Sequence, residues 1–317
     1  MATDLSVIHP ELRPIFQSFP RIPFNRWNVR LFQWLTRLMP RPKIHGDIQI
    51  EQVAVQSSNA NHSIRLRIYK PVAITSPSPV LFWIHGGGFI IGSVQMDDAY
   101  LILLAQELGI RIVSVDYRLA PDHPFPTPLD DCYCALKWTH DHAGQLGIDP
   151  GLIAVGGASA GGGLAATLVQ FAHDRGEVHP VFQLLVYPML DDRSTVRLNV
   201  PNKNLLTWTQ ENNRLGWESY LRQPCGMDET LPYAVAARRN DLAGLPPAWI
   251  GVGTLDLFYE EDVAYAKRLQ VCGVDCELVI VPGAFHGFDG FDHTLPVVRA
   301  FRNSQMKALR KYLLRNP

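Results

Sequence analysis

The stretch LIAVGGASAGGGLAATLVQ, residues 152–170, places a single serine, Ser159, among five glycines. An apolar run precedes the glycines and a second apolar run follows them, a pattern typical of a strand, a tight turn and a helix. Three roles are open for so much glycine: a loop that binds phosphate, a seam for helix packing, or a sharp turn that presents the serine. The choice among them decides the fold and the chemistry.

A phosphate-binding loop does not fit this stretch. A Walker loop needs a lysine followed by Ser or Thr, and residues 152–170 contain no lysine. Gly161, Gly163 and Ala166 do spell G-x-G-x-x-A. A dinucleotide fingerprint, however, lies in the turn directly after its strand, whereas this one begins where the helix is already expected to run.

The sharp turn fits better. Residues 157–161 spell G-x-S-x-G between an apolar strand and an apolar helix, which is the context of a nucleophile elbow. Small neighbours leave room for a strained serine backbone, and the helix start directs free N–H groups at the reacting centre. We therefore predict Ser159 as the nucleophile, and we expect Gly162 and Gly163 to let the helix pack close to the sheet.

A serine nucleophile needs a base, and the base needs an acid that orients it; in this architecture the order along the chain is Ser, acid, His. Four histidines follow Ser159, namely His173, His179, His286 and His293. His286 lies in a glycine-bounded loop directly after the apolar run 277–281, where active sites of α/β sheets form. We predict it as the base. His293, at the expected start of the last helix, is the second choice.

The acid is expected at the end of another strand, before the histidine. Asp256 follows the apolar run 248–253 and is the predicted acid. Glu260 and Glu261 come next, but they fall in the first turn of a predicted helix, where carboxylates complement the helix dipole. Two carboxylates at the end of another strand stay open as alternatives, Asp191 and Asp192.

A second glycine cluster, His85-Gly86-Gly87-Gly88, directly follows the apolar run 80–84. Glycine N–H groups approach a developing oxyanion without obstruction from side chains. An HGGG sequence after an early strand is the oxyanion-donor loop of esterases and lipases with an elbow of this kind. The G-x-S-x-G turn, Asp256, His286 and the HGGG loop together favour acyl hydrolysis.

The whole chain reads as repeated strand and helix units, which predicts an α/β fold with a mostly parallel sheet of about eight strands between helices. Residues 48–70 alternate polar and apolar and predict an antiparallel hairpin at the sheet edge. Two segments fit no such unit, 1–45 and 190–225. We predict one domain over 1–317, with a catalytic core of 46–189 and 226–317 and these two segments as a helical cap.

Composition excludes several classes of protein. Of the 317 residues, 29 are Lys or Arg and 30 are Asp or Glu, so the whole chain has no electrostatic reason to bind nucleic acid or an anionic membrane. Five cysteines at irregular spacing predict reduced thiols and no zinc site. No signal peptide or membrane-spanning run is recognised. We therefore expect a cytoplasmic protein without stable membrane insertion and without a metal.

Four blocks of sequence resemble the hormone-sensitive-lipase-like (family IV) group of microbial carboxylesterases, within the α/β-hydrolase superfamily: HGGGF (85–89), DYRLAPDHPFP (116–126), GGASAGGGLAA (156–166) and GAFHGF (283–288). The resemblance implies a serine esterase with a helical cap, no cofactor and often a homodimer. It also implies that the N–H groups of Gly87, Gly88 and Ala160 bind the oxyanion. The sequence departs from the group at Ala158, at Asp122 and in the DLFYEE context of Asp256.

These observations predict a serine carboxylesterase that hydrolyses small esters of short- to medium-chain acids through an acyl-enzyme on Ser159. Two alternatives stay open: a lipase acting on longer-chain acylglycerols, and a non-catalytic ligand-binding member of the same fold.

Overall fold

The computed structural model describes residues 4–38, 47–57, 62–74, 76–198 and 205–314. Within these ranges eight strands form one sheet, in the order β1-β2-β4-β3-β5-β6-β7-β8. The strands are β1 Ile48–Gln56, β2 Ser63–Pro71, β3 Ser78–Ile84, β4 Arg111–Asp116, β5 Ile148–Ala158, β6 Phe182–Val186, β7 Ala248–Leu255 and β8 Cys276–Phe285. The prediction of about eight strands is confirmed.

Most of the sheet is parallel. The strand pairs from β4 through β3, β5, β6 and β7 to β8 are all parallel, while β1 pairs antiparallel with β2 and β2 antiparallel with β4. The predicted edge hairpin is therefore confirmed, with Ile48 opposite Pro71. The carboxyl ends of parallel strands meet at one edge of the sheet, which is where the loops that follow β3, β5, β7 and β8 converge.

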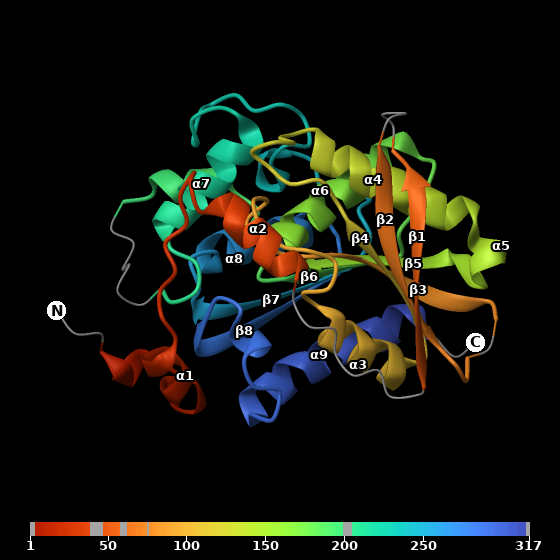
Figure 1. The fold of residues 1–317 in the computed structure, drawn as a ribbon, viewed down its shortest axis with the longest axis horizontal. Helices are drawn as coiled ribbons and strands as arrows, with labels where there is room; N and C mark the ends of the chain where they lie inside the picture. Colours follow the sequence, from red (N-terminus) through yellow and green to blue (C-terminus); the bar gives the residue numbers. More distant parts are fainter. Residues whose placement is uncertain (1–3, 39–46, 58–61, 75, 199–204, 315–317) are drawn as a thin grey trace.

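Helices cover both faces of the sheet (Figure 1). The α-helices of the described residues are α1 Arg13–Ser18, α2 Val29–Arg37, α3 Asp98–Leu108, α4 Thr127–Asp141, α5 Ala143–Leu146, α6 Ala160–Arg175, α7 Gln210–Leu221, α8 Tyr259–Val271 and α9 Pro296–Leu313. Helices α4, α6 and α8 pack on one face, and α3 and α9 pack on the other.

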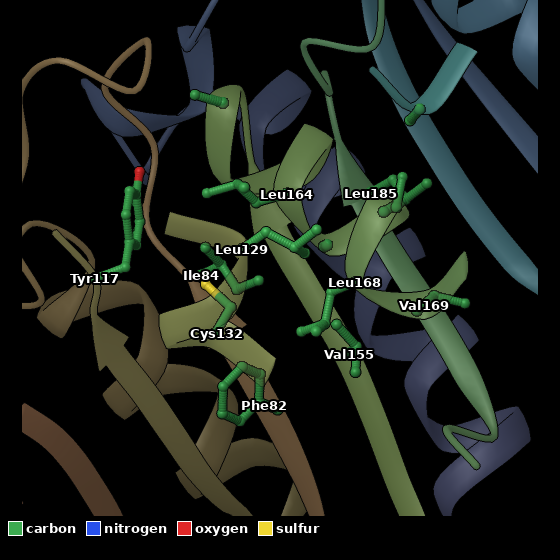
Figure 2. Packing of buried hydrophobic residues seen from close by; sticks show 14 of the residues in the cluster. Phe82, Ile84, Tyr117, Leu129, Cys132, Val155, Leu164, Leu168, Val169 and Leu185 are labelled. Carbon is green, nitrogen blue, oxygen red and sulfur yellow. The ribbon is translucent and has the colours of Figure 1, made fainter. Parts of the chain in front are cut away.

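The strand period of two divides the buried side chains between two cores. Phe82 of β3 belongs to the core beneath α4 and α6, whereas its neighbours Leu81 and Trp83 belong to the core beneath α3 and α9. Figure 2 shows the first core, in which Phe82 and Val155 lie among side chains of α4 and α6. A sheet buried on both faces explains why its strands are continuous apolar runs.

One predicted helix is wrong in its extent. The sequence pattern predicted a single helix over 128–147, but the helix breaks at His142, between α4 and α5. The N–H of His142 donates to the carbonyl of Trp138, and its ring stacks on the Trp138 ring at 4.5 Å between centroids. Gly147 then ends α5 in the left-handed conformation, which glycine adopts without a steric penalty.

The two segments that fit no strand and helix unit contact each other where the structure describes them. The N–H of Phe24 donates to Asn212 Oδ1 at 2.9 Å, and Asn212 Nδ2 donates to the carbonyl of Ile22 at 3.0 Å. The Phe24 ring lies 5.9 Å from the ring of Trp208. Of the predicted cap, residues 1–3, 39–45 and 199–204 lie outside the described residues, and its division from the core stays a prediction.

Three further observations concern only the described part of the chain. None of its helices is long and apolar enough to cross a membrane. All five cysteines are present there as free thiols. No cluster of His, Cys, Asp and Glu side chains in these ranges has the arrangement of a metal site.

Candidate active site

Ser159 lies alone between the end of β5 at Ala158 and the start of α6 at Ala160. Its backbone has φ of +56° and ψ of −122°, a region that costs a residue with a side chain about 1–3 kcal/mol. Neighbouring backbone holds it there, since its N–H donates to Val186 at 2.9 Å and its carbonyl accepts from Met189 at 2.9 Å. The turn therefore presents the hydroxyl beyond the sheet edge.

The chain after Ser159 passes very close to the end of β3. A Cβ added to Gly161 would lie 2.1 Å from the carbonyl oxygen of Ile84 and 2.4 Å from that of His85. Both obstacles are backbone atoms, which cannot move aside as a flexible side chain can. The second glycine of the G-x-S-x-G motif is therefore required by a close approach of two backbones.

Loops after three different strands bring Ser159, His286 and Asp256 together. His286 follows β8 and Asp256 follows β7. His286 Nε2 lies 3.0 Å from Ser159 Oγ, and His286 Nδ1 lies 2.8 Å from Asp256 Oδ2. All three residues are at least nine-tenths buried. A hydroxyl, an imidazole and a carboxylate are thus joined in one line of hydrogen bonds.

The imidazole and the carboxylate are both held by further contacts. The second oxygen of Asp256 accepts the N–H of Phe258 at 2.9 Å, and the Phe258 ring stands perpendicular to the His286 ring at 5.1 Å. Thr207 Oγ1 donates to the carbonyl of His286 at 2.5 Å. These contacts restrict rotation of the ring, so Nε2 stays directed at Ser159.

The glycine loop after β3 lies beside the serine. Gly87 and Gly88 both have left-handed backbones, and the carbonyl of Gly87 is occupied by the N–H groups of Ile90 and Ile91. A Cβ on Gly88 would lie 2.1 Å from Cη2 of Trp208, so the indole covers this glycine directly. In the described residues no hydrogen bond uses the N–H of Gly87 or Gly88. Ala160 begins α6, where the first N–H groups lack helical partners. All three N–H groups are therefore available as donors.

Comparison with known proteins places this geometry in a family. The sequence model of the α/β-hydrolase fold matches residues 81–290, which include both glycine motifs and all three hydrogen-bonded side chains. The chain belongs to the α/β-hydrolase family. The resemblance to its hormone-sensitive-lipase-like esterases is confirmed.

Relatives and solved structures agree with this assignment. Carboxylesterase NlhH of Mycobacterium tuberculosis is 34% identical over 321 aligned positions, covering 98% of this chain and 99% of the relative. An arylesterase of Saccharolobus solfataricus is 29% identical, covering 96% and 99%. The solved structure of a bacterial heroin esterase superposes with a TM-score of 0.91 at 35% identity, covering 99% and 100%.

The alternative bases of this hydrolase lie away from the serine. His173 and His179 are exposed, in and after α6. His293 is exposed in the loop before α9, which begins three residues later at Pro296. The described structure therefore brings only His286, of the histidines that follow Ser159, to the hydroxyl.

The alternative acids also have other partners. Asp191 pairs with Arg193, and Asp192 pairs with Arg238 and accepts the N–H of Gly226. Both carboxylates therefore anchor the segment that follows β6, and neither reaches the imidazole.

The interpretation of Glu261 as a carboxylate that only complements the helix dipole is wrong. Glu261 is buried and accepts the N–H groups of Leu190 and Asp191, at 2.7 and 3.1 Å, so it ties α8 to the chain after β6. Burial raises the pKa of Glu261 and of its neighbour Asp262 well above their usual range. Glu260, by contrast, is exposed and pairs with Arg197.

Sequence reasoning missed a tyrosine beside the imidazole. The Tyr187 ring lies 4.8 Å from the His286 ring, edge to face, and its hydroxyl donates to Asp289 Oδ1 at 2.7 Å. Arg302 Nη2 donates to the carbonyl of Asp289 at 2.7 Å. The only signal in the sequence was the position of Tyr187 directly after β6, one strand away from the elbow.

Proposed function

We propose that this hydrolase is a serine carboxylesterase that cleaves small esters of short- to medium-chain carboxylic acids through an acyl-enzyme on Ser159. The observation that carries the proposal is the hydrogen-bonded line from Ser159 Oγ through His286 to Asp256, at 3.0 and 2.8 Å. The names of the relatives, carboxylesterase and arylesterase, support the same substrate class.

In the first half of the reaction, Ser159 Oγ forms a bond to the ester carbonyl carbon while its proton passes to His286 Nε2. Asp256 accepts the hydrogen bond from Nδ1, which holds the tautomer and stabilises the imidazolium. The N–H groups of Gly87, Gly88 and Ala160 donate to the oxyanion. The bond from carbon to the alcohol oxygen then breaks, and the alcohol leaves with the proton from Nε2.

In the second half, water replaces the alcohol. His286 takes a proton from the water as its oxygen attacks the acyl carbon, and the same N–H groups stabilise the second oxyanion. Collapse of this intermediate breaks the bond to Ser159 Oγ, which regains its proton from Nε2. The carboxylic acid leaves, and the three side chains return to their starting state.

The helical cap belongs to this proposal, with 1–45 and 190–225 as the cap and 46–189 and 226–317 as the core. Support comes from two cap side chains that reach the site: Trp208 covers Gly88, and Thr207 binds the carbonyl of His286. A bulky indole above the oxyanion loop limits the space for the substrate, which favours small acyl groups over long ones.

Replacement of the nucleophile tests the proposal. Ser159→Ala should lower turnover of p-nitrophenyl butyrate by about 10⁶, the loss typical of a missing triad member. His286→Ala should be similarly inactive, whereas His293→Ala, a matched exposed histidine, should keep wild-type turnover. Near wild-type activity of Ser159→Ala would show that another residue is the nucleophile.

Substrate range separates the proposal from its two alternatives. A series of p-nitrophenyl esters should give the highest kcat/KM at short to medium acyl length. Faster hydrolysis of emulsified long-chain glycerides than of soluble esters would instead identify a lipase. A wild-type protein that no fluorophosphonate probe labels would be a ligand-binding member of the fold.

Three further parts of the proposal have their own measurements. The cytoplasmic location is tested by cell fractionation with an antibody to the native chain. A homodimer would appear at twice the 35.6 kDa chain mass in light scattering. The absence of nucleic-acid binding is tested by a mobility-shift assay with random-sequence DNA.

A further inference from the structure

Helix α2 carries a second apolar stripe, on the side away from the core. Its inward face is Val29, Phe32, Gln33 and Thr36, which are buried or half-buried. The opposite face, which we call the outer stripe, consists of Trp27, Leu31, Trp34, Leu35 and Leu38. The spacing of these residues places all five on one side of a helix that is extended by a turn at its start.

The outer stripe is in solvent. Trp27 is 92% exposed, and the other four members are between 43% and 58% exposed. Scattered single apolar residues on a surface are ordinary, but five on one face of one helix form a contiguous patch that indicates an interaction site. The two tryptophans are the residue type that favours a boundary between water and an apolar phase.

The charged residues of the segment that carries the stripe are all positive. Between Leu12 and Leu38 the chain contains five arginines and no Asp, Glu or Lys. Three of the arginines flank the stripe on α2 or just before it: Arg26, Arg30 and Arg37. Two carboxylates from other elements lie near these arginines. Asp122 pairs with Arg30, and Glu218 of α7 lines the same cleft as Arg26. The near-zero net charge of the whole chain hides this local excess.

We propose that the outer stripe of α2 is a docking surface for an anionic lipid bilayer, on which the protein lies without crossing it. Apolar side chains with aromatic residues on one face, flanked by arginines, are the features of a helix that binds in the plane of an interface. The leucines and tryptophans would enter the acyl boundary while the arginines meet lipid phosphates. In Figure 1, α2 lies across the front of the molecule beside α7.

A second copy of the chain fits this surface less well. A two-fold contact through the stripe would bring two groups of arginines together, and the segment has no carboxylate to pair with them. The substrate is not the occupant either, because the stripe faces away from Val29 and the core, whereas Ser159 is nine-tenths buried. An anionic surface is the partner that satisfies both the apolar residues and the positive charge.

Vesicle sedimentation tests the proposal on the full-length protein. The protein should pellet with phosphatidylcholine vesicles that contain roughly 30% phosphatidylglycerol, and not with pure phosphatidylcholine. Binding should fall steeply as salt rises from about 0.05 M to about 1 M, because salt screens exposed charges. Emission from Trp27 and Trp34 should be quenched by brominated lipid in the same vesicles.

Matched variants locate the surface. Trp34→Ser with Leu38→Ser should weaken binding to the anionic vesicles by about tenfold or more, since each substitution removes an apolar side chain that the bilayer would bury. The control pair Leu231→Ser with Val271→Ser, which are 61% and 87% exposed elsewhere, should leave binding unchanged.

The charge is tested in the same way. Arg26→Gln with Arg37→Gln should weaken binding roughly thirtyfold, from about 1 kcal/mol for each arginine. The control pair Lys267→Gln with Arg299→Gln should have little effect. Unchanged thermal midpoints of all variants would show that they fold.

Four results would overturn the proposal: no binding to anionic vesicles, equal binding to neutral vesicles, wild-type binding by the α2 variants, or conversion of a dimer to a monomer by Trp34→Ser with Leu38→Ser. The last result would identify the stripe as a contact between copies. The proposal does not depend on catalysis, because Ser159→Ala should bind vesicles as the wild type does. Failure of the ester hydrolase and failure of lipid binding are therefore distinguishable.

Discussion

A single methyl group at Gly161 should separate the nucleophile from the oxyanion loop. The Cβ of Gly161→Ala would lie 2.1 Å from the carbonyl oxygen of Ile84 and 2.4 Å from that of His85. Ordinary van der Waals contact begins at 3.4 Å, so the elbow and the end of β3 must move apart by about 1 Å. A misplacement of this size costs a catalysed reaction about 10² in rate.

The same overlap should destabilise the fold. Overpacking of a well-packed interior costs about 1–3 kcal/mol in the free energy of unfolding. Each kcal/mol corresponds to roughly 2–4 °C in the thermal midpoint of a domain of 150–250 residues. Gly161→Ala should therefore lower kcat/KM for p-nitrophenyl butyrate by about 10² and the midpoint by several degrees.

Gly144→Ala provides the matched control. Gly144 lies in α5 with nothing within 4 Å of the position of an added Cβ. Alanine should stabilise this helix by about 0.5–1 kcal/mol and leave kcat/KM unchanged. The reasoning is refuted if Gly161→Ala keeps kcat/KM within a factor of about two of wild type while its midpoint also matches the wild-type value.

Three other substitutions probe the surroundings of the site. Trp208→Ala removes the indole from above Gly88, so the optimum in a p-nitrophenyl ester series should move to longer acyl chains; an unchanged optimum would mean that Trp208 does not limit acyl length. Tyr187→Phe keeps the ring beside His286 but leaves the buried Asp289 without its hydroxyl donor. It should cost about 1–3 kcal/mol in urea unfolding while the pH profile of kcat stays that of the wild type; a shifted pH profile would show that the hydroxyl itself acts on His286. Asp262→Asn should raise the free energy of unfolding at pH 7 by about 1–3 kcal/mol. Burial raises the pKa of Asp262, so the folded state keeps this proton to higher pH than the unfolded state does. Wild-type stability therefore falls as pH rises above about 4. Asp262→Asn should lack this part of the decline, and the same pH dependence in both proteins would contradict the prediction.

Features within one strand and turn were predictable because their requirements are local. A buried parallel strand must be an apolar run, and an elbow must have small residues beside its serine. Residues 152–161 meet both requirements. The same reasoning predicted the two glycine motifs and the loops that follow the apolar runs 248–253 and 277–281. The break at His142 was not predicted, because residues 128–147 have a helical pattern throughout and the ring contact between His142 and Trp138 is visible only in the structure.

Contacts between distant segments were beyond the reach of the pattern. The sequence favoured Asp256 as the partner of His286 but left Asp191 and Asp192 open, since all three follow strands. The difference comes from the side chains they meet: Arg193 beside Asp191, and the imidazole 2.8 Å from Asp256. Glu261 likewise turned inward because the chain after β6 offers it two N–H groups.

The sequence by itself determined the parallel sheet, the strained serine turn and the glycine loop, because each depends on residues a few positions apart. Only the tertiary structure decided which carboxylate lies against the imidazole, that Trp208 covers Gly88, and that α2 has its inner face on the core and its outer stripe in solvent. Helical spacing alone shows two apolar sides on such a helix. The packing of the rest of the chain decides which side is buried and which is left for a partner.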